Sequence, residues 1–558
     1  MDKIVLDSDR RLGGPYTLAA ALLERLVPEA LARWPELVAA HDIEIRVAAP
    51  ALRSRVAPRR RSLAEGLPQE ERILIPGARR TLRIANGLAE FVRDHLRRRG
   101  ALEVVVRNLQ EADPSDRELV VVLARRLDPE LLRITAGPSA PGGGPLRTDF
   151  ARYRDEGFHH AMAEAGLETL RGMAFEDDPD GWHRLMHRVA GALEAVERED
   201  EARELYDRGR RRSTDPRYRA SMAYGTAMLL VRHHDHARRD PEEAMAWINE
   251  AVTIASLLPD PRLRAFHLGF DLNGKALVEV RAGRAEAALN LVEEAVALAE
   301  RHLPDEHPIH RLVLYANRAQ LLALAGRSRE ALDDYGRAIE MDPGYPDHYL
   351  DRGNLLHRLG RTAEALADYQ AVMRLSPPFP EAYYNRAEIR FTAGDLGGAL
   401  TDLDHTLELD PDFGPAYVNR AGIHALTGGY DLARRDVERG LQLEPGNAHL
   451  LCVLGQVEAA RGRAAEALAA FDAALESDPD LAPAWAGRGE IAYERGDHES
   501  ALTELTHALK LAESAELLFN RAVVLRAAGR PVEAARDLAR AHELDPDDEE
   551  IRRALADA

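Results

Sequence analysis

The sequence has little cysteine and lysine, and it has no long apolar run. One of its 558 residues is cysteine, Cys452, which excludes a framework of disulfide bonds and suits a reducing compartment. No stretch reaches the roughly 18 uninterrupted apolar residues of a membrane-spanning helix. The first apolar run, Ile4 to Leu6, is too short for a secretory segment. We therefore expect a soluble, cytoplasmic protein without membrane association.

Acidic charge is concentrated in the later part of the chain. Residues 1–150 contain 25 Lys and Arg and 21 Asp and Glu, a net charge of +4. This leaves 49 basic and 73 acidic residues in 151–558, a net charge of −24. Such a surface repels phosphates, so we expect no nucleic acid partner and favour basic or neutral peptide surfaces. The alternative is that the acid only keeps a long chain soluble.

Glycine returns at a fixed interval in the second half of the chain. Neighbouring members of the series are 34 residues apart, except for the last pair, which is 33 apart: Gly326, Gly360, Gly394, Gly428, Gly462, Gly496 and Gly529. Alanine follows every one of these glycines after five residues, and proline follows most of them after 17. A period of this length is typical of a stack of identical supersecondary units.

Each period contains two helical stretches. The residues from Tyr315 to Ala325 are periodic and end at Gly326, where a left-handed residue can terminate a helix. A second stretch runs from Glu330 to Met341 and ends before Pro343. Because one such pair cannot bury its apolar face alone, neighbouring pairs must stack. The sequence therefore predicts an all-α superhelical solenoid of antiparallel helix pairs.

The recurring order of small residue, Gly, Ala, aromatic, Ala and Pro resembles the tetratricopeptide repeat (TPR) family. Residues 311–548 carry regular copies and residues 183–310 carry divergent ones, about ten repeats in all. We expect a helical cap at 149–182 and a C-terminal capping helix at 549–558. The resemblance implies binding of protein partners without identifying them. The bias toward arginine over lysine resembles the composition of high-GC bacterial genomes.

The resemblance also implies a partner-binding groove lined by the first helix of each repeat. In TPR proteins that hold extended peptides, asparagine nine residues before the turn glycine reaches the ligand, and its amide matches a peptide group. Here the residues at this position that we assign to partner binding are Asn317, Asp351, Asn385, Asn419 and Asn520. Glu381, Tyr384 and Glu388 add acid and an aromatic ring that would suit a peptide carrying Arg or Lys.

Two groups of residues at or next to this position could have structural roles in place of a role in partner binding. The asparagines would have a purely structural role if they bond only between repeats. An arginine follows most of these positions, as at Arg318 and Arg352, and we expect it to pair with an acid on the adjacent helix.

The N-terminal region alternates short β-rich runs with helical ones, which predicts an α/β domain over residues 1–136. Candidate buried parallel strands are Lys3–Leu6, Ile43–Ala48, Leu102–Val106 and Leu131–Thr135. Helices are expected near 18–26, 82–98 and 116–126. Glycine and proline then dominate residues 137–148, which is typical of a linker.

Two segments of this domain resemble the signalling NTPases of the STAND type that carry TPR arrays. Gly13, Gly14 and Thr17 follow the first strand, where those proteins have a phosphate-binding loop. Asn108 and Asp113 lie in a segment like their second nucleotide motif. The lysine that would neutralise phosphates is replaced by Pro15, and the strand-end carboxylate is replaced by asparagine. We therefore expect a degenerate P-loop-like domain without hydrolysis, with an α-helix N-terminus near Thr17 that could hold an anion weakly.

Other candidate motifs carry less weight. Gly269 to Lys275 matches the spacing of a phosphate loop but lies in a predicted helix with no strand before it. The run His233-His234-Asp235-His236 lacks the i, i+4 spacing of a helical zinc pair and is expected to be an exposed loop. Cys452 has no partner histidine placed by the sequence.

These patterns together predict a non-enzymatic TPR scaffold or adaptor, with no cofactor and no metal, that recruits a basic or neutral protein or peptide through an acidic concave groove. The alternative is a nucleotide-responsive signalling NTPase that acts through a partner protein. A metal-assisted hydrolase that uses the histidine run is a remote third hypothesis.

Overall fold

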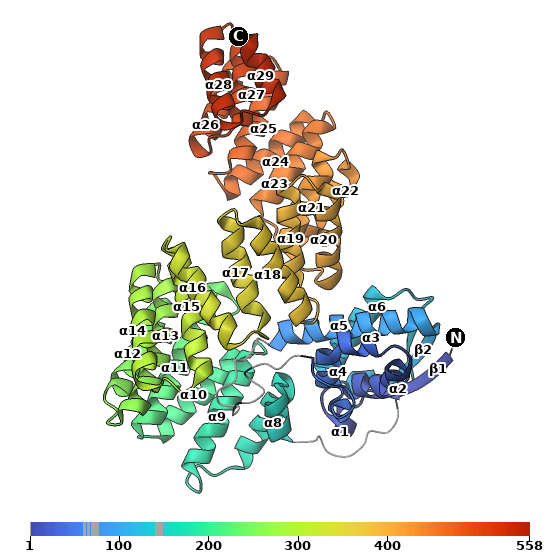
Figure 1. The fold of residues 1–558 in the computed structure, drawn as a ribbon, viewed down its shortest axis with the longest axis vertical. Coiled ribbons are helices and arrows are strands. Elements are labelled where there is room, and N and C mark those ends of the chain that lie inside the picture. Colours follow the sequence, from blue (N-terminus) through green and yellow to red (C-terminus); the bar gives the residue numbers. More distant parts are fainter. Residues whose placement is uncertain (1, 60–62, 64–66, 68–76, 140–148, 558) are drawn as a thin grey trace. The chain divides into compact units, whose positions relative to one another are not determined.

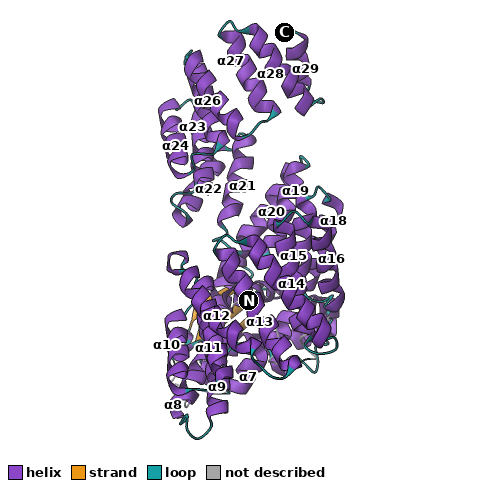
Figure 2. Cartoon of the chain, turned by 90° about the vertical axis from the view of Figure 1, so that its left-hand side faces the viewer, coloured by secondary structure: helices purple, strands orange, loops and turns teal. Residues whose placement is uncertain are grey.

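The computed structural model describes residues 2–59, 63, 67, 77–139 and 149–557. The chain divides into two compact units, Met1–Ala382 and Tyr383–Ala558. Helices account for nearly all of the regular structure (Figure 2). No helix among the described residues combines the length and the apolar composition needed to cross a bilayer.

The first unit begins with a small parallel sheet of the order β1-β2-β3. Its strands are β1 (Asp2–Asp7), β2 (Leu102–Arg107) and β3 (Leu132–Ala136). Ile4 pairs with Val104, which in turn pairs with Ile134. Three of the four predicted strands are therefore confirmed, with parallel pairing as expected for strands that follow helical crossovers.

The fourth predicted strand, Ile43–Ala48, is wrong, because these residues form a helix. Apolar and polar residues alternate here, which favours a strand, but Ile45 and Ala48 lie one helical turn apart and both are buried. Packing of the chain thus outweighs a short local pattern. The helices of this region are α1 (Arg10–Gly13), α2 (Thr17–Arg33), α3 (Pro35–Ala40), α4 (Asp42–Ala48), α5 (Gly77–Arg99) and α6 (Pro114–Arg126).

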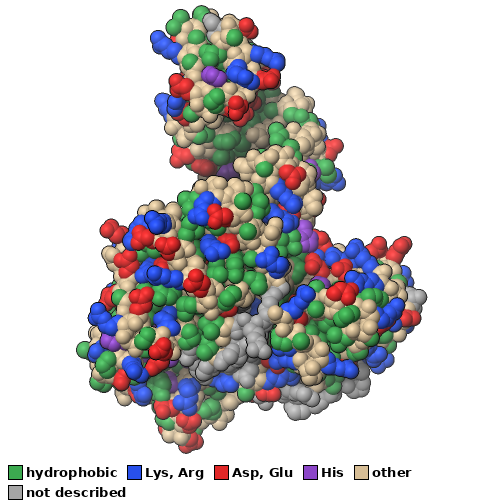
Figure 3. All heavy atoms as spheres, in the orientation of Figure 1, with side chains coloured by type: hydrophobic (Ala, Val, Ile, Leu, Met, Phe, Trp, Pro, Cys, Tyr) green, Lys and Arg blue, Asp and Glu red, His purple; other side chains and the backbone are tan. Residues whose placement is uncertain are grey.

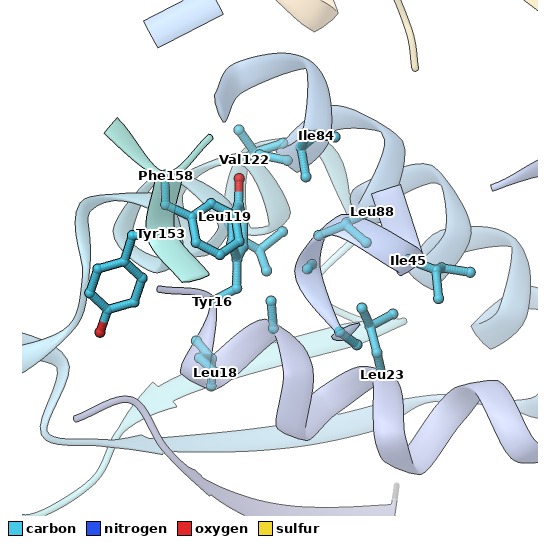
Figure 4. Packing of buried hydrophobic residues seen from close by; sticks show 14 of the residues in the cluster. Tyr16, Leu18, Leu23, Ile45, Ile84, Leu88, Leu119, Val122, Tyr153 and Phe158 are labelled. Atoms are coloured by element: carbon cyan, nitrogen blue, oxygen red, sulfur yellow. The ribbon is translucent and has the colours of Figure 1, made fainter. Parts of the chain in front are cut away.

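The core around the sheet continues into the helices that follow residues 137–148. Tyr16 packs against Phe158 with ring centroids 5.5 Å apart, and Tyr153 belongs to the same buried cluster (Figure 4). The predicted linker 137–148 lies mostly outside the described residues. The α/β region therefore shares its core with α7 and the beginning of α8, although a linker was predicted between them.

Paired helices make up the remainder of both units (Figure 1). In the first unit they are α7 (Phe150–Glu156), α8 (His159–Gly172), α9 (Pro179–Glu194), α10 (Glu199–Arg212), α11 (Pro216–Arg232), α12 (Pro241–Ser256), α13 (Pro261–Arg281), α14 (Ala285–His302), α15 (Pro308–Leu324), α16 (Ser328–Met341), α17 (Pro346–Arg358) and α18 (Thr362–Leu375). Helix α19 (Pro380–Thr392) begins in the first unit and ends in the second. The second unit continues with α20 (Leu396–Leu409), α21 (Gly414–Leu426), α22 (Tyr430–Leu443), α23 (Ala448–Ala460), α24 (Ala464–Ser477), α25 (Ala482–Glu494), α26 (His498–Leu511), α27 (Ala515–Ala527), α28 (Pro531–Leu544) and α29 (Glu549–Ala556).

The turn between the two helices of a repeat explains the glycine series. All seven predicted glycines have positive φ, between 71° and 79°, and Gly283 of a divergent repeat has a φ of 76°. A Cβ added at any of them would meet nothing within 4 Å. Glycine is therefore required by backbone conformation at these turns and not by crowding.

Candidate partner-binding surface

The predicted partner-binding residues lie on the first helices of successive repeats. Asn317 and Asp351 lie on α15 and α17, Asn419 and Asn520 lie on α21 and α27, and the remaining four lie on α19: Glu381, Tyr384, Asn385 and Glu388. Every one of them is half-buried. First helices of consecutive repeats also contact one another, as α13 does with α15 and α21 with α23. Within each unit, the candidate residues therefore occur at a recurrent position of the first helices.

In the first unit, two of these residues join neighbouring repeats. The Asn317 side chain donates to Oδ1 of Asn273 on α13, at 2.9 Å. The Gln320 side chain on α15 donates to Oδ2 of Asp351 on α17, at 3.0 Å. Both contacts stabilise the stacking of first helices.

In the second unit, asparagine has the same role. Asn419 donates to the Tyr384 hydroxyl at 3.1 Å, and Asn520 donates to Oε1 of Glu490 at 3.3 Å. The structural role left open by the sequence is therefore present at Asn317, Asn419 and Asn520. An amide carries two N–H donors and one oxygen acceptor, so a single bond of this kind leaves capacity for a ligand.

Burial makes the acids of this surface harder to ionise. It raises the pKa of Asp351 to about 6, with Asp347 acting in the same direction and the Gln320 hydrogen bond against it. Burial also raises the pKa of Glu490, and the nearby Glu516 and Glu494 add to that shift. A cationic side chain placed here would favour the ionised form of these carboxyl groups.

Partly buried ion pairs, in which the aspartate is the more buried member, hold the two helices of a repeat together. An arginine of the first helix donates through Nε and Nη2 to both carboxylate oxygens of an aspartate 16 residues later, at 2.6 to 2.8 Å. The pairs are Arg318–Asp334, Arg352–Asp368, Arg386–Asp402, Arg420–Asp436 and Arg521–Asp537. The predicted pairing of these arginines with the adjacent helix is confirmed, and it explains why they are unsuited to hold a partner.

Family models of the tetratricopeptide repeat match residues 316–380, 423–482 and 515–548. The matched segments contain five of the seven turn glycines and three of the five ion pairs described above, Arg318–Asp334, Arg352–Asp368 and Arg521–Asp537. These segments are tetratricopeptide repeats. The chain is thus a mostly helical TPR solenoid preceded by a small parallel sheet.

Several solved structures are similar to parts of this chain. The APC/C hetero-tetramer Cut9-Hcn1 matches at 14% identity over 73% of this chain and 94% of that one, with a TM-score of 0.36. A TPR protein from Parabacteroides merdae matches at 19% identity over 52% and 97%, with a TM-score of 0.30. PilF of Pseudomonas aeruginosa matches at 17% identity over 38% and 97%, with a TM-score of 0.32. No curated protein matches the sequence significantly.

The residues predicted as a vestigial nucleotide site lie where strands β1 and β2 end. Gly13 ends α1, Gly14 has a φ of 81°, and the Thr17 hydroxyl donates to the Gly14 carbonyl oxygen at 2.7 Å. The Asn108 side chain donates to the Asp7 carboxylate at 3.0 Å, and Asp113 caps α6 by accepting from the Ser115 N–H. Each of these polar groups is thus already bonded within the chain.

A carboxylate of the chain occupies the helix N-terminus at which a phosphate would bind. Asp116 of α6 accepts from the backbone N–H groups of Leu18 and Ala19 at 2.9 and 3.0 Å. Burial raises the pKa of Asp116 to about 7, while these hydrogen bonds oppose the shift. No local pattern predicts this contact, because it joins residues almost 100 positions apart. The anion site expected near Thr17 is therefore filled by the protein itself.

We expect Mg-ATP to leave the thermal stability of the protein unchanged. The Asp116 carboxyl group already occupies the backbone N–H groups at the first turn of α2 that a phosphate would need, and the loop lacks a phosphate-binding lysine. Thermal unfolding with millimolar Mg-ATP should therefore shift the melting temperature by less than about 1 °C. A clear rise would favour the nucleotide-responsive alternative, and ADP and Mg²⁺ alone serve as controls.

A half-open cavity of about 320 Å³ lies beside this loop. Its lining includes Gly14 and Asp113 from the strand ends and Tyr153, Glu164 and Arg171 from α7 and α8. Ligands of open α/β sheets bind at such strand ends. Basic and acidic side chains both line the cavity, and Arg10 is already paired with Glu164 at 2.7 Å, so the charges do not indicate one class of ligand.

The histidine run lies against the first turn of α10. His234 Nδ1 is 2.8 Å from Oε1 of Glu199, and ligand atoms of Glu199, His233 and His234 lie within 4.8 Å of one another. The Asp235 N–H donates to Nδ1 of His233, so the neutral ring carries its proton on Nε2 and offers no lone pair there. This cluster fits an ion pair better than a metal centre. The prediction of an exposed loop is wrong for His233, which is buried.

Two further candidates lie in ordinary repeat helices. The segment from Gly269 to Lys275 lies entirely within α13, which confirms that its phosphate-loop spacing has no strand before it. Cys452 is buried on α23, and burial raises its pKa to about 12, so the thiolate needed for nucleophilic chemistry is disfavoured.

Proposed function

We propose that this protein is a non-enzymatic adaptor that binds a protein or peptide partner along the first helices of its TPR repeats. The observation that carries the proposal is the recurrent, half-buried row of asparagine, acid and tyrosine on α19 and α21. Such a surface offers hydrogen bonds to a peptide backbone and negative charge to basic side chains.

The charge of the repeats supports a basic or neutral partner. Residues 151–558 carry a net charge of −24, and acid surrounds several first-helix positions. On the face drawn in Figure 3, acidic and basic side chains are interspersed over the repeats. The proposal therefore rests on local acids beside the asparagines and not on one continuous acidic patch. Under this proposal the α/β region serves as a second docking or switching surface.

Replacement of both Asn385 and Asn419 by alanine should weaken partner binding by about thirtyfold, since each of the two lost hydrogen bonds costs about 1 kcal/mol. The test is affinity capture of partners from the native cell with each variant. A matched control is Glu438→Ala, which removes an exposed acid from the second helix of a repeat, α22. Equal recovery of every partner by the double variant and the control would refute the choice of surface.

A further inference from the structure

The helix α5 of the α/β region places one arginine against the repeats. Arg83 is 9% exposed, and its guanidinium carbon lies 3.4 Å above the centre of the Phe379 ring. The same guanidinium is 4.0 Å from Oδ1 of Asp347, the second residue of α17. These partners are 264 and 296 positions away in sequence, so no local pattern could have revealed the contact.

The surroundings of Arg83 have the chemistry of a guanidinium site. A planar guanidinium can stack on an aromatic face and face a carboxylate at the same time, which an ammonium group does less well. Phe379 is held rigidly, because it is 2% exposed and packs with Val372 and Ala382. Asp347 lies in the first turn of its helix, where a carboxylate is favoured.

A second contact from the same region lies beside this site. The Leu63 backbone N–H donates to Oδ2 of Asp342 at 3.2 Å, and Asp342 immediately follows helix α16. The α/β region thus contacts the acidic turn between α16 and α17 at two points. At both points the contact is with an acidic side chain of the repeats. The proposed function assigns negative charge of this kind to partner binding.

We propose that Arg83 is a built-in ligand of the TPR array, and that an arginine of the partner takes its place between Phe379 and Asp347. This inference rests on the proposed function and specifies its partner as an arginine-bearing peptide. Arg83 is held in the same chain, so it competes at a high effective concentration. Its removal should therefore strengthen binding of an external arginine peptide.

The test uses the full-length protein and a short fluorescein-labelled peptide of alternating glycine and arginine. Fluorescence anisotropy should show that Arg83→Ala binds this peptide at least about fivefold more tightly than the wild type. The matched lysine peptide should gain less. The control is Arg97→Ala, which removes an exposed arginine from the same helix. Among the described residues, Arg97 pairs only with Asp94, so this variant should not change the affinity.

Two further variants separate a binding site from a structural contact. Phe379→Leu in the Arg83→Ala background should abolish the gain, because the aromatic face is lost. Arg83→Lys retains the charge and should give an affinity between those of the wild type and Arg83→Ala. If Arg83→Ala does not fold, Arg83→Lys still tests the inference. Equal affinities for the wild type and both Arg83 variants, or a gain that survives Phe379→Leu, would overturn the inference.

The outcome is separable from that of the proposed function. If the Arg83 variants behave as the wild type while the Asn385 and Asn419 double variant loses partners, the built-in ligand is wrong and the adaptor stands. If Arg83→Ala gains affinity while the double variant recovers every partner, the guanidinium site stands and the choice of surface on α19 and α21 is wrong.

Discussion

Replacing Arg352 with alanine should lower the free energy of unfolding of the first unit by about 3 kcal/mol, because it leaves a buried carboxylate without its counter-ion. Arg352 donates two hydrogen bonds to Asp368 at 2.8 and 2.7 Å, and the Asp368 side chain is 6% exposed. Asp368→Ala should cost less, since the Arg352 side chain left behind is 27% exposed and can be hydrated.

The same repeat supplies the control. Arg361 pairs with Glu364 at 2.7 Å, but both side chains are about half exposed, at 46% and 57%. Arg361→Ala should therefore have little effect on the free energy of unfolding, because water screens an exposed pair. Urea unfolding should be combined with hydrogen exchange of the α17 and α18 amides, because a repeat array need not unfold in one step. Equal costs for the two arginine variants would show that burial of the pair is unimportant.

Asp271→Asn should stabilise the first unit at pH 8 and have little effect near pH 4. Asp271 lies on α13, is 6% exposed, and receives no hydrogen bond from a described residue. Burial raises its pKa from 3.8 to about 8. The folded protein therefore binds a proton that the unfolded chain releases, and wild-type stability falls as the pH rises from about 4 to about 8. Asparagine removes that cost.

The expected gain in the free energy of unfolding at pH 8 is about 3 kcal/mol. This is half of the value that the full rise in the pKa of Asp271, from 3.8 to about 8, would give at about 1.4 kcal/mol per pH unit. Unfolding curves of the wild type and the variant should be compared across this pH range. Burial also raises the pKa of Glu194 to about 7, so only the difference between the two proteins isolates Asp271. Glu294→Gln, at an exposed position of α14, is the matched control, because it makes the same kind of change at a carboxyl group that is not buried. A constant difference at every pH would contradict the prediction.

The repeat architecture could be predicted because its signals are local and recur. Gly326 and Gly360 each end a helix within the same short segment that carries the apolar pattern, and both have the positive φ that was expected. The pairing of Arg318 was also foreseen, because its partner Asp334 lies on the adjacent helix of the same repeat. Strand prediction failed at Ile43–Ala48, where six residues of alternating polarity are too few to decide between helix and strand.

The interactions that the sequence did not reveal join distant segments. Asp116 reaches the first turn of α2, Glu199 reaches His234, and Arg83 reaches Phe379. Each contact depends on how helices pack in space. No periodic pattern in a single sequence predicts a contact between segments so far apart. The candidate surface is an intermediate case, because its positions followed from the repeat while the bonds between its side chains did not.

The ion pairs within each repeat have a consequence for any change in the number of repeats. Arg352 and its partner Asp368 belong to the two helices of one 34-residue segment, so their charges balance inside that segment. Duplication or excision of a whole segment would add or remove both members together and leave no orphaned charge behind. A change in the number of segments would therefore leave the charge balance of this kind of pair intact.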